Sequence, residues 1–364
     1  MRILAIDIGT GTQDVLLFDS EAVLENCVQM VLPSPTQIVA QQVERATKTR
    51  RDLLLTGVTM GGGPCGWAVE RHLAAGCRVF ATPEAARTFD DDLEQVRSLG
   101  VILVDERESQ RLGDVERIEM RDLDVETITS ALTCFGVSPR LDGIAVALLD
   151  HGAAPPGVSD RAFRFKILRE ATEKTRSMFA FAHLRQNVPA VLTRMQAVAS
   201  SAPTDVPLLL MDTGPAAVLG ALQDRAVAKH DDVVLVNVGN MHTLGFHLHA
   251  EKIVGFFEHH TGQLSRSKLD LYLEELAKGT LTNERVFDDH GHGCLIFDKT
   301  RGSRAVPAVA VTGPQSGMLR PSRLRPYFAV PHGIMMLAGC FGLLRAFAEA
   351  VPEWREAILD RLSA

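Results

Sequence analysis

The chain has 364 residues, which is enough for two domains that each bury a core of their own. Hydrophobic residues make up 46% and charged residues 23%, a composition that excludes a disordered chain. The net charge of −7 gives no electrostatic reason to expect nucleic acid as a partner. The most apolar stretch, Ile334 to Leu344, is too short to span a membrane, and the six cysteines form no C-x-x-C pair. We therefore expect a cytoplasmic protein with reduced thiols.

Residues 1–19 predict a β-hairpin. The apolar run Ile3 to Ile6 leads to Asp7, and a second run, Val15 to Phe18, follows too soon for a helix to fit between them. The turn consists of small and hydroxyl-bearing residues, Gly9, Thr10, Gly11 and Thr12. Such a turn approaches a ligand closely and suits phosphate oxygens, while the carboxylate of Asp7 could hold a divalent cation. An ordinary hairpin whose Asp faces water is an equal alternative.

Asp7-Ile-Gly-Thr, followed by apolar residues up to Asp19, resembles the first phosphate motif of the actin, sugar-kinase and heat-shock ATPase superfamily. The likeness is closest to the carbohydrate kinases of the FGGY type. It implies an α/β fold of two actin-like (ribonuclease H-like) domains with a central cleft, and ATP and Mg²⁺ as cofactors, with Asp7 positioning the Mg²⁺. In one respect the chain departs from the pattern: those kinases usually carry Arg or Lys where this chain has Asp14.

Gly61-Gly62-Gly63-Pro64-Cys65-Gly66 fits G-x-G-x-x-G between a strand-like run and a helix that begins near Trp67. A strand then runs to Ala81, with Glu84 beyond it, so the segment resembles a flavin or nicotinamide fingerprint. The internal position and Pro83 at the strand end favour a tight strand-to-helix turn that lines the cleft. A dinucleotide (NAD or FAD) enzyme built on Gly61–Gly66 is the alternative.

A buried strand over Leu141 to Leu149 delivers Asp150 and His151 to its carboxyl end, where ligands usually lie in parallel sheets. A catalytic role for Asp150 and simple capping of the next turn are equally supported. Pro203 to Pro207 reads as the domain joint. We expect an N-terminal actin-like domain over residues 1–203, with an insertion at about 57–125, and a C-terminal actin-like domain over 204–364.

A strand over Leu208 to Met211 precedes the segment Asp212-Thr213-Gly214-Pro215-Ala216-Ala217-Val218-Leu219-Gly220. The segment is similar to Asp-x-x-x-Ala-Ala-x-x-Gly after the hinge of FGGY kinases, where the Asp takes the proton of the substrate hydroxyl. The resemblance therefore implies a catalytic base at Asp212. Asp before an Ala/Leu run also caps a helix well, and both roles can hold together.

A second hairpin is predicted further on. The strand Asp232 to Val238 is followed by a Gly turn and by a partner strand, Leu244 to Leu248. This pseudo-repeat of the first hairpin indicates two related halves that face one cleft. It resembles the second phosphate motif of the superfamily, which implies phosphate contacts from Gly239, Asn240 and Thr243. Asn237 stands where an acid is usual.

Two short segments, Glu258-His259-His260 and His290-Gly291-His292-Gly293-Cys294, hold four of the twelve histidines. Imidazole, carboxylate and thiolate are ligands for zinc or iron, although the spacing matches no known metal motif. Histidines that line the cleft and bind phosphate or substrate are as well supported. The candidates for substrate or metal binding are His151, Glu258, His259, His260, His290 and His292.

The strand Ala308 to Val311 leads into a Gly-rich turn that resembles the adenosine motif of the superfamily. This implies adenosine contacts from four residues of the turn, Gly313, Gln315, Ser316 and Gly317. A closing helix over Pro331 to Phe347 is expected after it.

The whole chain also resembles a bacterial and archaeal family grouped with the actin-like ATPases, some of whose members are labelled "pyruvate formate-lyase activating enzyme". That label describes radical chemistry at an iron–sulfur cluster, and the sequence has no C-x-x-x-C-x-x-C, so we do not expect this chemistry. We predict an ATP- and Mg²⁺-dependent phosphotransferase or ATPase. Asp212 or Asp150 would orient the attacking hydroxyl or water of a small-molecule or protein acceptor. Because of Asp14 and Asn237, a non-catalytic protein that senses a nucleotide or small molecule is the second hypothesis.

Overall fold

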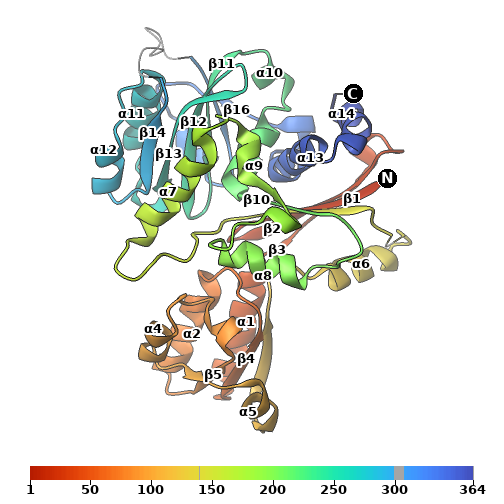
Figure 1. The fold of residues 1–364 in the computed structure, drawn as a ribbon, viewed down its shortest axis with the longest axis vertical. Helices are drawn as coiled ribbons and strands as arrows, with labels where there is room; N and C mark the ends of the chain where they lie inside the picture. Colours follow the sequence, from red (N-terminus) through yellow and green to blue (C-terminus); the bar gives the residue numbers. More distant parts are fainter. Residues whose placement is uncertain (139, 299–306, 364) are drawn as a thin grey trace.

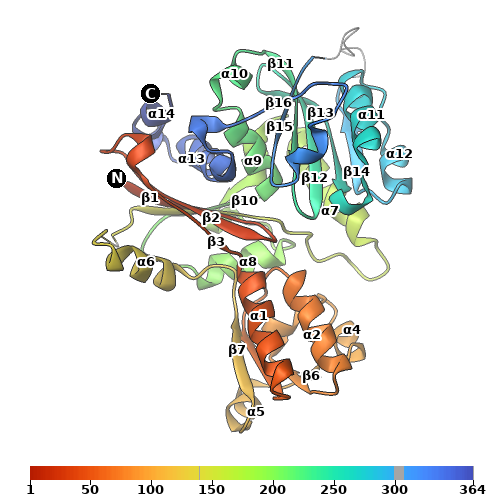
Figure 2. The same ribbon diagram turned by 180° about the vertical axis from the view of Figure 1, so that it is seen from behind.

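The computed structural model describes residues 1–138, 140–298 and 307–363. These residues form two six-stranded mixed sheets and one four-stranded parallel sheet (Figures 1 and 2). The four-stranded sheet and its helices lie to one side, below the other two sheets in both views. The cleft described below lies where the three units meet.

The first sheet has the order β3-β2-β1-β8-β10-β9. Its first three strands form an antiparallel meander, and β8 and β10 then run parallel to β1. Strands β8 and β10 are apolar throughout, and β1 is apolar from Ile3 to Ile6, because both faces of these segments are buried. The bounds are β1 (Arg2–Ile8), β2 (Thr12–Asp19), β3 (Val28–Pro33), β8 (Gly143–Leu148), β9 (Ala182–Leu184) and β10 (Leu208–Met211).

The second sheet repeats this design in the order β14-β13-β12-β11-β15-β16. An antiparallel meander of β11, β12 and β13 is again followed by two strands parallel to its first strand. The bounds are β11 (Asp232–Val238), β12 (His242–His249), β13 (Lys252–His260), β14 (Gly293–Ile296), β15 (Ala308–Thr312) and β16 (Tyr327–Phe328). This repeated topology confirms the predicted fold of two actin-like domains.

Two helices cross between the sheets. Helix α9 (Thr213–Ala221) leaves the first sheet and packs on the second, whereas α13 (Ala338–Ala350) follows the second sheet and packs on the first. A Cβ on Gly220 would collide with the Ala338 carbonyl, and one on Gly342 with the Ala216 carbonyl. Small residues therefore allow the crossing, which joins both sheets into one core.

Other helices cover the outer faces. Helices α6 (Val125–Cys134) and α8 (Thr193–Ser201) cover the first sheet. Helices α11 (Arg266–Ala277) and α12 (Asn283–Asp288) cover the second sheet, and α7 (Asp160–Glu173) packs beside β14. Figure 1 shows α7 beside the strands of the second sheet. The smaller helices are α10 (Arg225–Ala228) and α14 (Arg355–Ser363).

The inserted unit has four parallel strands in the order β6-β5-β4-β7. Its strands are β4 (Leu53–Gly57), β5 (Val79–Ala81), β6 (Ile102–Leu103) and β7 (Glu116–Met120), and its helices are α1 (Pro35–Lys48), α2 (Pro64–Ala74), α3 (Pro83–Ala86), α4 (Leu93–Ser98) and α5 (Glu106–Arg111). The unit thus begins at about Pro35, earlier than the 57–125 insertion that the sequence suggests. The predicted N-terminal domain ended at residue 203, but β10, which lies after this position, pairs with β8 in the first sheet.

Three expected elements differ from the structure. The alternation from Glu21 to Val31 predicts a third strand, but β3 begins only at Val28, after a 3-10 turn over Leu24–Asn26. The stretch from Arg161 to Ser200 reads as mostly helical with a break at Pro189, but α7 ends at Glu173 and the next α-helix begins only at Thr193. The closing helix starts at Ala338, because His332 takes a left-handed conformation with φ of 50° and only 3-10 turns form before it.

Within the described residues, no single helix is long and apolar enough to cross a membrane. One pair, Met335–Ala350 with Pro352–Ser363, meets the criteria of length and composition only when its two parts are taken together across a 117° bend.

Candidate functional site

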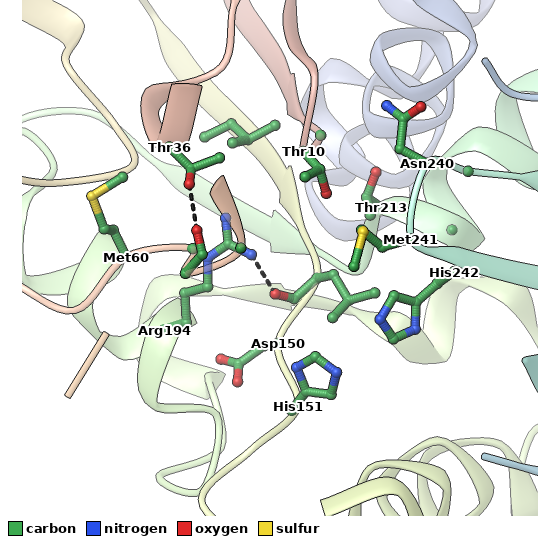
Figure 3. A pocket seen from close by; sticks show the side chains of 18 of the residues that line it. Thr10, Thr36, Met60, Asp150, His151, Arg194, Thr213, Asn240, Met241 and His242 are labelled. Carbon is green, nitrogen blue, oxygen red and sulfur yellow. Dashed lines mark hydrogen bonds between the residues drawn. The ribbon is translucent and has the colours of Figure 1, made fainter. Parts of the chain in front are cut away.

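A cleft of about 690 Å³ opens between the two actin-like domains and the inserted unit. The β1–β2 turn, the β11–β12 turn, the loop before α2 and the chain after β8 all contribute to its lining. Figure 3 shows Thr10 and Asn240 on one side of the cleft, with His151 and His242 facing each other on another. The predicted phosphate turns and the predicted strand-end residues therefore share one cavity.

Both hairpin turns are closed by an equivalent backbone hydrogen bond. The amide of Gly9 donates to the carbonyl of Thr12 at 2.9 Å, and the amide of Gly239 donates to the carbonyl of His242 at 2.9 Å. A Cβ on Gly239 would lie 2.7 Å from that carbonyl oxygen, so the turn requires glycine. The turns also meet: a Cβ on Gly11 would lie 3.0 Å from Nδ2 of Asn240.

The predicted phosphate residues separate into two groups. Gly9, Thr10, Thr12, Gly239 and Asn240 line the cleft. Gly11 and Thr243 lie outside the lining. The side chain of Thr243 is fully buried, and its hydroxyl lies 3.0 Å from the hydroxyl of Thr261, which donates to the Gly239 carbonyl. Thr243 thus supports the turn from behind.

Asp7 and Asp14 lie directly opposite each other on β1 and β2, so their side chains share one face of the sheet. Oδ1 of Asp7 accepts a hydrogen bond of 2.5 Å from the hydroxyl of Thr213, while Oδ1 of Asp14 is buried and has no partner within the described part of the chain. Burial raises the pKa of both carboxyl groups to about 7, and the charge of Asp14 adds to the shift of Asp7. Two such carboxyls with a free oxygen fit a divalent cation.

The other two predicted carboxylates are fully hydrogen-bonded. Asp150 lines the cleft, but its oxygens accept from the amides of Gly152 and Met195 at 2.9 and 2.8 Å. Asp212 is 3% exposed and caps α9 through the amide of Gly214. Burial raises the pKa of both groups, while their hydrogen bonds and nearby arginines oppose the shift. The contacts observed for Asp150 and Asp212 are therefore those of capping residues, the role that the sequence offered as the alternative to catalysis.

A buried arginine that the sequence analysis missed connects these groups. Arg164 of α7 is 1% exposed, donates to Asp212 at 2.5 Å and forms an ion pair with Glu258 at 3.2 Å. Burial by itself would raise the pKa of Glu258, but the guanidinium outweighs this effect and holds the pKa well below its ordinary value. Oε1 of Glu258 in turn lies 3.2 Å from Nδ1 of His242.

Three histidines from separate parts of the chain meet in the cleft. Nitrogens of His151, His242 and His292 lie within 4.8 Å of one another. The ring of His260 packs 4.5 Å from that of His292. Burial lowers the pKa of His260 to about 4 and that of His292 to about 2, so these two rings are neutral.

The cluster contains three of the histidines that the sequence marked as candidates, His151, His260 and His292. It also contains His242, which the sequence did not mark because it lies in the second predicted phosphate turn. Two other candidates point elsewhere. His259 is buried with Nε2 3.3 Å from Asp289, and His290 is exposed; neither lines the cleft.

The predicted adenosine turn reaches the cleft with only part of its length. Gly313 lines the cleft, and a Cβ there would lie 2.5 Å from Oδ1 of Asn237. Gln315 donates to Oδ1 of Asn240 at 3.0 Å and so ties this turn to the second hairpin. Gln315, Ser316 and Gly317 lie outside the cleft lining.

The Gly61–Gly66 segment has the local structure that a dinucleotide fingerprint requires. It connects β4 to α2, and the parallel strand β5 follows. Arg194, held by Asp122 at 2.6 Å, packs so closely that a Cβ on Gly61 would lie 2.6 Å from its Nη2. Glu84, the expected ribose ligand, is exposed on α3.

The family model described as "Putative pyruvate format-lyase activating enzyme (DUF1786)" matches residues 60–318, more than two thirds of the chain. The chain belongs to this family. All six cysteines of this DUF1786 member are free, and all but Cys134 are buried. None of the curated proteins compared with the chain matches it.

Solved structures similar to this DUF1786 protein include ethanolamine utilization protein EutJ from Carboxydothermus hydrogenoformans. It has 13% identity and a TM-score of 0.31, over 94% of this chain and 89% of that one. A Listeria monocytogenes protein described as "a putative N-acetylmannosamine kinase" has 11% identity and a TM-score of 0.35, over 96% and 99%. A Ppx/GppA family member from Aquifex aeolicus has 8% identity and a TM-score of 0.29, over 96% and 90%. With such low scores, the fold assignment depends on the topology of the two sheets.

Proposed function

We propose that this protein is an ATP- and Mg²⁺-dependent phosphotransferase or ATPase that acts in the central cleft. The observation that carries the proposal is the contact between the two hairpin turns, at Gly11 and Asn240. Thr10 and Thr12 of the first turn and Asn240 of the second line the cleft, and hydroxyl and amide side chains suit phosphate oxygens. A triphosphate held from both domains would draw the two domains together.

Mg²⁺ fits the carboxyl pair Asp7 and Asp14. The buried Oδ1 of Asp14 lacks a partner, and a hard cation with oxygen ligands would supply one. When bound, Mg²⁺ neutralises charge on the phosphate oxygens. Asp14 thus takes a role different from the Arg or Lys of the FGGY kinases, since it would hold the cation in place of contacting phosphate directly.

The nucleoside would lie against the turn that follows β15. Gly313 lines the cleft as bare backbone, because Asn237 and Val238 fill the space that a Cβ would need, and we propose that a flat ring packs on this backbone. Gln315 is bonded to Asn240 and would link the nucleoside side of the cleft to the phosphate turns. Because Gln315, Ser316 and Gly317 lie outside the lining, we limit the proposed direct contact to Gly313.

The acceptor would enter near Asp150 and His151, on the chain after β8. Asp150 lines the cleft, so we propose that it orients the attacking hydroxyl or water. Asp212 does not line the cleft, and we propose that it acts through Arg164 as a positioning residue. The acceptor is a small molecule or a protein.

Nucleotide binding and phosphate release test this proposal together. The full chain is titrated with Mg-ATP by calorimetry, and phosphate or ADP is followed with candidate acceptors. Binding at micromolar concentration with turnover supports an enzyme. Binding without turnover under all conditions supports instead the nucleotide-sensing protein. If Mg-ATP does not bind, both the enzyme and the nucleotide-sensing protein are ruled out.

A second candidate function, a dinucleotide enzyme, is favoured by one observation. The loop Gly61–Gly66 lies between parallel strands β4 and β5 and opens α2 toward the cleft, as a pyrophosphate site requires. NAD or FAD would then raise the thermal midpoint of the chain while ATP would not. The substitution Gly62→Asp would abolish that shift, whereas the exposed control Gly113→Asp would leave it unchanged.

A further inference from the structure

We propose that His151, His242 and His292 bind one divalent transition-metal ion, Zn²⁺ or Fe²⁺ in class, with a coordination position open to the cleft. This site is separate from the Asp7–Asp14 pair and does not depend on the nucleotide-binding proposal.

The geometry of the three rings is the first support. Each offers a nitrogen, and these nitrogens lie within 4.8 Å of one another. Ligand nitrogens around one tetrahedral zinc ion are about 3.3 Å apart, given Zn–N bonds of about 2.0–2.1 Å. Small side-chain rotations would therefore complete the site. The residues come from the chain after β8, from the start of β12 and from the loop before β14, so the tertiary fold creates the cluster.

His292 supplies a second, independent observation. His292 is 1% exposed, yet neither of its ring nitrogens has a hydrogen-bond partner among the residues that the structure describes. A buried imidazole without any partner is costly, because it has left water without compensation. A metal ion bound to one nitrogen would provide that compensation, and the ring lines the cavity in which the other two histidines lie.

The surroundings of His242 match those of a metal ligand. Its Nδ1 lies 3.2 Å from Glu258, which leaves Nε2 for a metal. Metal-bound histidines usually donate their other ring N–H to a carboxylate, and this contact fixes the ring orientation. Glu258 is itself fully buried and held by Arg164, so the orienting carboxylate is rigid.

The ligand set decides the class of metal. Imidazole nitrogens favour zinc, iron, copper or nickel, whereas Mg²⁺ prefers oxygen ligands. Three protein ligands with an open position are typical of catalytic metal sites, in which a water or substrate oxygen takes the fourth place. Because His151 adjoins Asp150 and lies on the cleft surface, the open position faces the space proposed for the acceptor. The acceptor would therefore present an oxygen donor to this ion.

The test uses the full, untagged chain after removal of metal by a chelator. Co²⁺ is titrated and its visible absorption is recorded, because imidazole coordination in a site of low symmetry gives intense bands. Competition with Zn²⁺ then gives the affinity. We expect one ion per chain, and a loss of affinity of about tenfold or more in both His151→Ala and His292→Gln. His290→Gln, an exposed neighbour in sequence, should bind as the wild type does.

His151 is exposed, so its substitution should leave folding intact, and it remains informative if His292→Gln fails to fold. Asp14→Asn should bind Co²⁺ with unchanged affinity, which separates this site from the proposed Mg²⁺ site. The proposal is overturned if no visible bands appear at one equivalent of Co²⁺, or if His151→Ala binds as tightly as wild type.

Discussion

Asp14 lies directly opposite Asp7 across the first hairpin, so two buried carboxyl groups face the same space above β1 and β2. Thr213 hydrogen-bonds one oxygen of Asp7 from the start of α9, but Oδ1 of Asp14 has no partner. Two like charges so placed repel each other unless a proton or a cation lies between them. Protonation and cation binding should therefore compete at this place.

The first prediction concerns pH. Burial raises the folded-state pKa of Asp7 and Asp14 from 3.8 to about 7. Between these values the folded state binds more protons than the unfolded state, so stability falls as the pH rises from about 4 to about 7. In EDTA, we expect the thermal midpoint of wild type to fall relative to that of Asp14→Asn as the pH rises from about 4 to about 7. Mg²⁺ should reverse the fall above pH 7.

The measurement is circular dichroism melting at each pH, with EDTA or with Mg²⁺. Comparison with Asp14→Asn cancels the titration of all other groups. A midpoint difference that stays constant from pH 4 to 8 would show that the two carboxyls do not share protons in the folded state.

A second prediction concerns Gly339 in α13. A Cβ at this position would collide with the carboxyl group of Asp7, because the helix passes directly over the side chain. Gly339→Ala should therefore lower the free energy of unfolding by about 1–3 kcal/mol, the usual cost of overpacking. It should also weaken Mg²⁺-dependent nucleotide binding. Urea unfolding measures the first effect, and calorimetry with Mg-ATP measures the second.

The matched control is Gly262→Ala, because a Cβ there meets nothing within 4 Å. This variant should keep wild-type stability and affinity. If Gly339→Ala behaves like the control, α13 does not fix the position of Asp7.

The hairpins and the Gly-rich turns could be predicted from the sequence because their signals are local, whereas the two actin-like sheets were expected from the resemblance to the actin-like superfamily. Two apolar runs that flank a Gly/Thr turn leave room only for a hairpin, and β10 was predicted with its observed bounds, Leu208–Met211. The inserted unit was predicted less well. Its strand β7 has charged residues, Glu116 and Arg117 among them, and reads as a solvated segment until its pairing with β4 is known.

The site was predicted unevenly for the same reason. Arg164 reads as one of several basic residues on a helix, yet it contacts Glu258, which lies 94 positions away in the chain. His242 occupies the last position of the second turn, which Thr12 occupies in the first, so its pattern suggests phosphate binding. Only the tertiary fold reveals that both residues belong to one polar cluster.

A third prediction concerns Asn240, which links the two turns. Asn240→Asp changes a donor amide into a carboxylate of the same shape, next to Gly11. The new charge should repel a triphosphate, so we expect the affinity for Mg-ATP to fall by about tenfold or more. Affinity for adenosine should not change. Calorimetry with both ligands measures this, with the exposed Asn187→Asp as control; equal losses for ATP and adenosine would contradict a phosphate contact.

The fourth prediction concerns Arg164, which neutralises two buried carboxylates. Arg164→Met keeps much of the side-chain volume but leaves Glu258 and Asp212 without their cation. Breaking a buried ion pair on one side costs about 3–5 kcal/mol, because the remaining charge stays out of water. Lys166→Met, on the same helix but exposed, should cost less than about 0.5 kcal/mol. Urea unfolding of both variants provides the comparison.

The pH dependence of this loss identifies its cause. Without the guanidinium, burial dominates at Glu258 and raises its pKa, so the carboxyl group can take up a proton in the folded state. The folded variant then binds more protons than its unfolded form, and its stability relative to wild type should improve as the pH falls from 8 to 5. A loss of stability that is the same at both pH values would instead point to a packing defect around the new methionine, and the charge argument for Arg164 would fail.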